Sequence, residues 1–75
     1  MVDNRGIVFV VEERNHRVTR WLPGYEEGEI IAGGHDPGRE PNQLNHPVGL
    51  AFDTHGNIYV ADSWNHRVQR FSIVL

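Results

Sequence analysis

The chain has 75 residues with a net charge of −3, made up of 7 basic and 10 acidic side chains, and it contains no cysteine. This length allows one small domain at most, and the absence of cysteine excludes disulfides and thiolate zinc sites as its stabilisers. The slight acidic excess disfavours broad binding to a phosphate backbone, and the aliphatic runs are too short to cross a membrane.

Short runs rich in β-branched and aromatic residues, separated by Gly, Pro, Asn and Asp, predict an all-β protein. No stretch has the three-to-four spacing of apolar residues that a helix needs over ten or more positions. In chain order, the predicted strands span residues 7–12, 17–21, 29–32, 48–53, 57–61 and 67–73.

Two of these runs, Ile7–Val11 and Ile58–Ala61, are apolar without interruption. A strand with one wet face alternates apolar and polar residues, so continuous apolarity predicts that both faces are covered. In an antiparallel protein this occurs where small sheets stack face to face. Gly49 and Ala51 are small, which suits an innermost strand where such sheets converge.

An internal repeat relates the two halves of the chain. Residues 6–21 align without a gap with residues 56–71, and seven of the 16 positions are identical. The repeated core reads VVEERNHRVTRW in the first copy and VADSWNHRVQRF in the second. A period of 50 residues points to a propeller or a solenoid, and the strand pattern excludes the helical solenoids.

The most repeated part of this cassette is a turn between two predicted strands. Asp62 ends one strand, Asn65 lies within the turn, and Arg67 begins the next strand. Asx side chains hydrogen-bond to nearby backbone amides and tolerate left-handed backbone angles. We therefore expect Asp62 and Asn65 to tie the turn together and Arg67 to reach back to a carboxylate or carbonyl. The predicted structural turn motif comprises Glu12, Asn15, His16, Arg17, Asp62, Asn65, His66 and Arg67.

The run PVGLAFDTHGNIYVADSWNHRVQRF, residues 47–71, resembles an NHL repeat, with Asp53, Gly56 and the Asn-His-Arg-Val turn among its matching features. The first copy matches from Asp3 onward, although it has Glu12 where the family usually has Asp. The segment 30–47 resembles an outer strand and the connector between blades. The resemblance implies antiparallel four-stranded blades of an NHL-type β-propeller, most often six-bladed.

Applied to this chain, the resemblance implies an incomplete propeller of about six strands. Residues 1–34 are expected to form strands two to four of one blade, residues 35–46 the inter-blade connector, and residues 47–75 strands one to three of the next blade. Such a piece exposes strand edges and apolar blade faces. We expect a fragment or incomplete gene product rather than a self-assembling unit.

Five histidines raise the possibility of a metal site, because imidazole binds zinc, copper, iron and nickel. His16 and His66 occupy equivalent positions on successive blades, which keeps them a blade width apart. His35 and His55 are expected in exposed loops. The glycine-rich segment 32–38 lacks a phosphate-loop pattern, and the chain has no lysine. We predict no metal site and no cofactor.

No catalytic residue is predicted. Ser63 has His66 nearby in sequence, but no third residue is placed to orient the imidazole. The resemblance includes propeller enzymes whose sites are built from several blades at the channel mouth. Fewer than two blades do not supply such a set.

The expected function is therefore that of a non-catalytic protein-interaction scaffold, whose partner is another protein or further propeller blades of the same chain or a second copy. Because some members of the family bind single-stranded RNA, RNA recognition is the alternative, and a fragment of a propeller enzyme is the second alternative. Arg14 and Trp64 occupy equivalent turn positions and form the possible interaction surface. The acidic pairs 12–13 and 26–27 dilute the positive field. The other aromatic residues are expected between blades.

Overall fold

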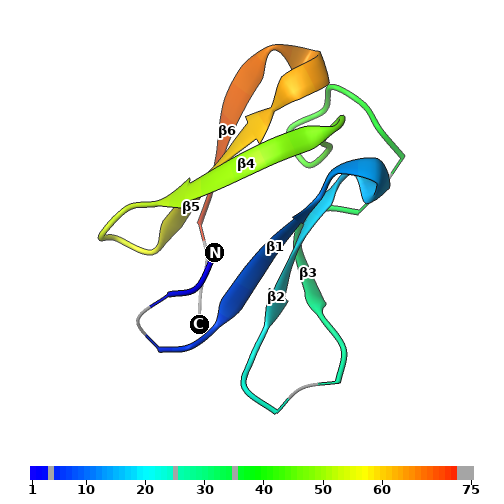
Figure 1. The fold of residues 1–75 in the computed structure, drawn as a ribbon. Helices are drawn as coiled ribbons and strands as arrows, with labels where there is room; N and C mark the ends of the chain where they lie inside the picture. The colour runs from blue at the N-terminus through cyan, green and yellow to red at the C-terminus, as the bar shows by residue number, and fades with distance from the viewer. Residues whose placement is uncertain (4, 25, 35, 73–75) are drawn as a thin grey trace.

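The computed structural model describes residues 1–3, 5–24, 26–34 and 36–72. Two antiparallel sheets of three strands each make up this part of the chain, in the orders β1-β2-β3 and β4-β5-β6 (Figure 1). His35 and the last residue of the predicted strand 67–73 lie outside the described residues. The six strands are β1 (Val8–Glu12), β2 (Arg17–Trp21), β3 (Glu29–Gly33), β4 (Pro47–Phe52), β5 (Asn57–Asp62) and β6 (Arg67–Ser72).

The predicted all-β class is confirmed. The only helical segments described are two single 3₁₀ turns, η1 (Glu13–Asn15) and η2 (Ser63–Asn65), which join β1 to β2 and β5 to β6. None of the described helices is long and apolar enough to span a membrane.

The two copies of the repeat form equivalent hairpins in separate sheets. Glu12 pairs with Arg17 at the end of the β1–β2 hairpin, and Asp62 pairs with Arg67 at the end of the β5–β6 hairpin. The sheets lie against each other with β1 beside β4 (Figure 1). The repeated cassettes are thus in adjacent stacked sheets and not in one continuous ribbon.

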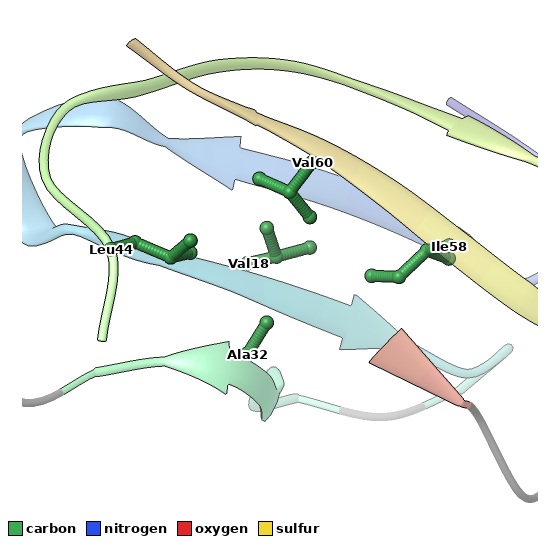
Figure 2. Packing of buried hydrophobic residues seen from close by; sticks show 5 residues of the cluster. All are labelled: Val18, Ala32, Leu44, Ile58 and Val60. Carbon is green, nitrogen blue, oxygen red and sulfur yellow. The ribbon is translucent and has the colours of Figure 1, made fainter. Parts of the chain in front are cut away.

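The core lies between the sheets. Figure 2 shows Val18 of β2 facing Ile58 and Val60 of β5, with Ala32 of β3 and Leu44 around them. Val18, Ile58 and Val60 are fully buried, and full burial of such a side chain stabilises the fold by about 1.5–3 kcal/mol. Leu44 comes from the segment between β3 and β4, so this connector contributes directly to the core.

Aromatic residues extend the contact between the sheets. Phe9 of β1 is buried and meets Phe52 of β4 edge to face, with 4.7 Å between ring centroids. Trp21, Tyr59 and Phe71 are half-buried. The expected aromatic contact between stacked sheets therefore forms at Phe9 and Phe52.

The outer face of the first sheet is only partly covered: Thr19, which pairs with Val10 and Ile30, is buried and accepts a hydrogen bond from Trp21 Nε1. Val8, Val10 and Ile30 are 37%, 38% and 47% exposed. The sequence predicted coverage on both sides of each apolar run, and β1 is covered only on the side that faces the second sheet. This is the exposed apolar face expected of a chain with fewer than two complete blades.

The small residues of β4 are not explained by crowding. β4 is an edge strand of its sheet, and a Cβ added to Gly49 would meet no described atom within 4 Å. Ala51 is exposed. Convergence of strands around these two residues, as the sequence predicted, does not occur within the described part of the chain.

Candidate functional site

The turn of the second sheet is built around a buried carboxylate. Asp62 is fully buried at the end of β5 and accepts hydrogen bonds from Asn65 Nδ2 at 2.9 Å and Arg67 Nε at 2.8 Å. The backbone N–H of Asn45 donates to its other oxygen at 2.7 Å. Burial raises the pKa of Asp62, but the bonds from Asn65, Asn45 and Arg67 outweigh it and hold the pKa below its ordinary value.

The same turn also binds the connector, the segment between β3 and β4. Arg67 donates from Nη1 to the Arg39 carbonyl at 2.8 Å and from Nη2 to the carbonyls of Glu40 and Gln43, both at 3.1 Å. Asn65 Nδ2 donates to the Gly38 carbonyl at 2.7 Å, and Gln69 Nε2 donates to the Gln43 carbonyl at 2.8 Å. The turn motif is therefore a clamp: its side chains hold a segment that comes more than 20 residues earlier in the chain.

The turn of the first sheet repeats the inner part of this arrangement. Glu12 accepts hydrogen bonds from Asn15 Nδ2 at 3.1 Å, Arg17 Nη2 at 2.9 Å and Thr19 Oγ1 at 2.8 Å. The bond from Arg17 contributes most to holding the pKa of Glu12 below its ordinary value; burial opposes it, and the bonds from Thr19 and Asn15 help to outweigh burial. The Glu12 side chain is 23% exposed, whereas that of Asp62 is fully buried.

A second Asx motif, which the sequence reasoning did not assign to any site, precedes each hairpin. Asp53 accepts bonds from the backbone N–H groups of His55 and Asn57, from Asn57 Nδ2 and from Tyr59 Oη. The bond from Asn57 Nδ2 is the main cause that holds the pKa of Asp53 well below its ordinary value. Asp3 accepts the equivalent backbone bonds in the first copy. The alignment of Asp3 with Asp53 in the repeat is therefore the sequence feature that could have identified this motif.

The Asn-His pairs mark left-handed backbone. His16, His46 and His66 have φ values of 53°, 52° and 53°. Histidine tolerates this conformation better than bulky or β-branched residues, which accounts for its place at the end of each turn. His16 and His66 are not brought together; the neighbour of His16 is His46, whose N–H donates to His16 Nδ1 at 3.0 Å. No cluster of three potential ligand residues lies within the described ranges.

Three rings form a stack where the two sheets meet. His46 lies parallel to Trp64, with 3.6 Å between ring centroids and an angle of 18° between planes. His16 also contacts the ring of His46, edge to face, with 4.6 Å between ring centroids. Trp64 remains 61% exposed, and its backbone N–H donates to the Asn45 carbonyl at 3.1 Å. Arg14 occupies the equivalent position on η1 and is also exposed.

Most of the arginines near the turns are paired with acids. Arg17 pairs with Glu12, Arg67 with Asp62, and Arg20 with Glu29 at 2.6 Å. Arg5 likewise pairs with Asp3. Four of the seven arginines are therefore paired with acids within the protein, whereas Arg14, Arg39 and Arg70 are exposed.

Residues 44–71 match the family model of the NHL repeat. A search of curated proteins returned no match. NHL repeats form β-propellers that are generally non-catalytic and typically mediate protein interactions. The match spans η2 and all three strands of the second sheet, and the first sheet repeats its hairpin geometry. The chain therefore carries an NHL repeat at residues 44–71 within an all-β architecture of NHL-propeller type.

Proposed function

We propose that the chain acts as a non-catalytic scaffold segment of an NHL-repeat propeller and that the surface around Trp64 and His46 binds a protein partner. The observation that carries this proposal is the exposure of Trp64, 61%, in a ring stack at the edge of a well-packed core. Tryptophan is enriched in protein interfaces, where one buried aromatic side chain contributes much of the binding energy.

The tryptophan is also held in place before any partner arrives. Stacking on His46 restricts its ring, and the bond from its N–H to the Asn45 carbonyl fixes its backbone. A side chain that is already ordered loses less conformational entropy on binding. This preorganisation supports a role for Trp64 in binding a partner and argues against an exposed side chain without a function.

The charge arrangement favours protein over RNA. Binding of single-stranded RNA combines stacking aromatics with cations that contact phosphates. Trp64 supplies a stacking surface, but Arg17, Arg20 and Arg67 are paired with carboxylates. Glu13, which is exposed, lies next to Arg14 on η1. The surface is mixed in sign, as is common in protein interfaces.

Within this proposal, the chain's partners include further propeller blades. Residues 1–34 and 47–75 would each supply part of a blade, joined by the connector 35–46. The outer face of the first sheet, with Val8, Val10 and Ile30, is apolar as a blade interface requires. The Trp64 surface would remain accessible, because it lies at the turn end of the hairpin.

Selection from a random peptide display library tests the proposal. Peptides selected on the wild-type chain are expected to lose most of their affinity for Trp64→Ala, at least about tenfold for an aromatic anchor, and to retain affinity for the matched surface variant Arg70→Ala. Far-UV circular dichroism checks that both variants stay folded. Selected peptides that bind Trp64→Ala as well as wild type would overturn the proposal.

A parallel titration with a random-sequence single-stranded RNA pool separates the alternative. At low salt, where electrostatic binding is strongest, the proposal expects no saturable change in tryptophan fluorescence. Saturable RNA binding that disappears in Trp64→Ala would replace the protein partner with RNA.

A further inference from the structure

We propose that His16 is a pH-sensitive contact that controls the order of the Trp64 surface. Neutral His16 holds His46 in its stack with Trp64, and protonated His16 releases it. The effect on partner binding rests on the proposed function of Trp64, whereas the contact between the two histidines does not.

The contact depends on one nitrogen of His16. The backbone N–H of His46 donates to His16 Nδ1 at 3.0 Å, so this nitrogen carries no proton. A neutral imidazole has one donor and one acceptor nitrogen, whereas both nitrogens of the charged ring are donors. Protonation of His16 therefore places a proton on Nδ1 and removes the acceptor of the His46 N–H.

His46 responds differently to a proton. Its Nδ1 lies 2.8 Å from Asn45 Oδ1, an oxygen that can only accept, so Nδ1 of His46 is the donor. A proton taken up by His46 binds Nε2 and leaves both of its hydrogen bonds in place. The sensitivity to pH therefore resides in His16, on the first hairpin, and not in the ring that stacks on Trp64.

His46 connects His16 to the exposed tryptophan. Its ring contacts that of His16 edge to face, with 4.6 Å between centroids, and stacks on Trp64 at 3.6 Å. The backbone of His46 has a φ of 52°, a conformation that is unfavourable for a residue other than glycine and persists only where surrounding contacts hold it. Loss of the bond to His16 removes one of these contacts and loosens the stack.

The surrounding charges do not stabilise a protonated His16. The ionisable groups on the elements that meet here are Glu12, Glu13, Arg14 and Arg17 of the first hairpin, Asp36, Arg39 and Glu40 of the connector, and Asp62, His66 and Arg67 of the second hairpin, while His35 lies outside the described residues. Every ion pair in the described part of the chain has an arginine as its cation. No carboxylate there pairs with His16 or His46, so a charge on His16 is not offset.

An NMR titration of the ¹⁵N-labelled 75-residue chain from about pH 8 to about pH 5 tests the contact without any variant. Histidine changes charge in this range, whereas the pKa values of Asp62 and Glu12 lie below 3.8 and 4.5, so these carboxylates keep their charge. The amide proton signal of His46 should shift upfield as its hydrogen bond is lost, in step with the ring signals of His16. A His46 amide that does not shift, or that follows only its own ring, would overturn the proposal.

The variant His16→Asn separates the acceptor from the titration. Asparagine tolerates the left-handed backbone, and its amide oxygen accepts an N–H at any pH in this range. The upfield shift of the His46 amide should therefore disappear. His66→Asn, the same change at the equivalent exposed position with a φ of 53°, should leave the shift as in wild type.

Peptide binding tests the effect on the Trp64 surface. A selected peptide that requires Trp64 and contains no histidine should bind wild type and His66→Asn about fivefold more weakly at about pH 5.5 than at about pH 7.5, roughly the effect of one hydrogen bond. It should bind His16→Asn equally at both pH values. Equal affinities for wild type would overturn the regulatory role of His16. Peptides that bind independently of Trp64 would contradict the proposed function alone, and the NMR titration would still decide whether His16 is the pH-sensitive contact.

Discussion

The hairpin turns of the two sheets have the same backbone conformation and similar residues, but their surroundings differ. Asp62 is fully buried and holds the connector, whereas Glu12 is 23% exposed and, within the described ranges, its side chain bonds to side chains of its own hairpin. Val60 is fully buried and Val10 is 38% exposed. A repeated motif therefore fixes a local shape, while its contribution to stability depends on what covers it.

Removing the turn carboxylate is expected to give the largest difference in lost stability between the two copies. Asp62→Ala leaves the donors of Asn45, Asn65 and Arg67 without their acceptor, which costs about 3 kcal/mol or more. Since small domains are only marginally stable, this variant is expected to unfold the chain. Glu12→Ala removes a partly exposed ion pair and should cost about 1 kcal/mol. Urea denaturation followed by far-UV circular dichroism measures both, and equal losses would contradict the comparison.

The valines at equivalent positions in the first strand of each repeated hairpin, Val10 of β1 and Val60 of β5, give the next largest difference in stability. Val60→Ala removes a fully buried side chain next to Val18 and Leu44 and is expected to cost about 1.5–3 kcal/mol. Val10→Ala, the same chemical change at the equivalent position, should cost less than about 1 kcal/mol because the side chain is already partly in water. Thermal unfolding of the two variants under identical conditions compares them directly. A Val10→Ala variant as unstable as Val60→Ala would mean that something covers the outer face in solution.

The sequence was sufficient for the fold class and the strands because both depend on local patterns. Short β-branched runs, the turn residues and the offset of 50 determine the hairpins without reference to long-range contacts. The bonds from Asn65 and Arg67 to Asp62 follow from the same local pattern, since these residues lie within five positions of each other.

The contacts of the connector could not be predicted in this way. Arg67 and Gln69 reach carbonyls 24 to 28 residues earlier, and backbone carbonyls leave no residue pattern in a sequence. The stack of His46 on Trp64 depends on how the connector returns to the second sheet. Three Asn-His pairs were visible in the sequence, but only the backbone shows that each histidine adopts a left-handed conformation.

Acid should destabilise the chain through the carboxylates of both hairpin turns, Asp62 and Glu12, as well as through Asp53. The pKa values of Asp62 and Glu12 in the folded chain lie below their ordinary values of 3.8 and 4.5. The unfolded chain therefore binds more protons in this range, so the stabilisation is present above about pH 4.5 and is lost as pH falls below it. Asp62→Asn should flatten the dependence of unfolding free energy on pH between 5 and 3. Glu27→Gln, an exposed change of the same kind, should leave the slope as in wild type, and an unchanged slope in Asp62→Asn would be inconsistent with the buried role of this carboxylate.

The smallest expected difference separates the two turn histidines. His66 is exposed and has a φ of 53°, so His66→Gly relieves the left-handed strain, offset by the greater freedom of glycine in the unfolded chain; a stabilisation of up to about 1 kcal/mol is expected. His16 has the same φ but accepts the N–H of His46 through Nδ1, so in His16→Gly the loss of that bond, about 1 kcal/mol, offsets the relief of strain, and no net stabilisation is expected. Urea midpoints of the two variants measure this difference. If both glycines stabilised the chain equally, the bond from His46 to His16 would contribute nothing, and the first turn would not help to hold the connector.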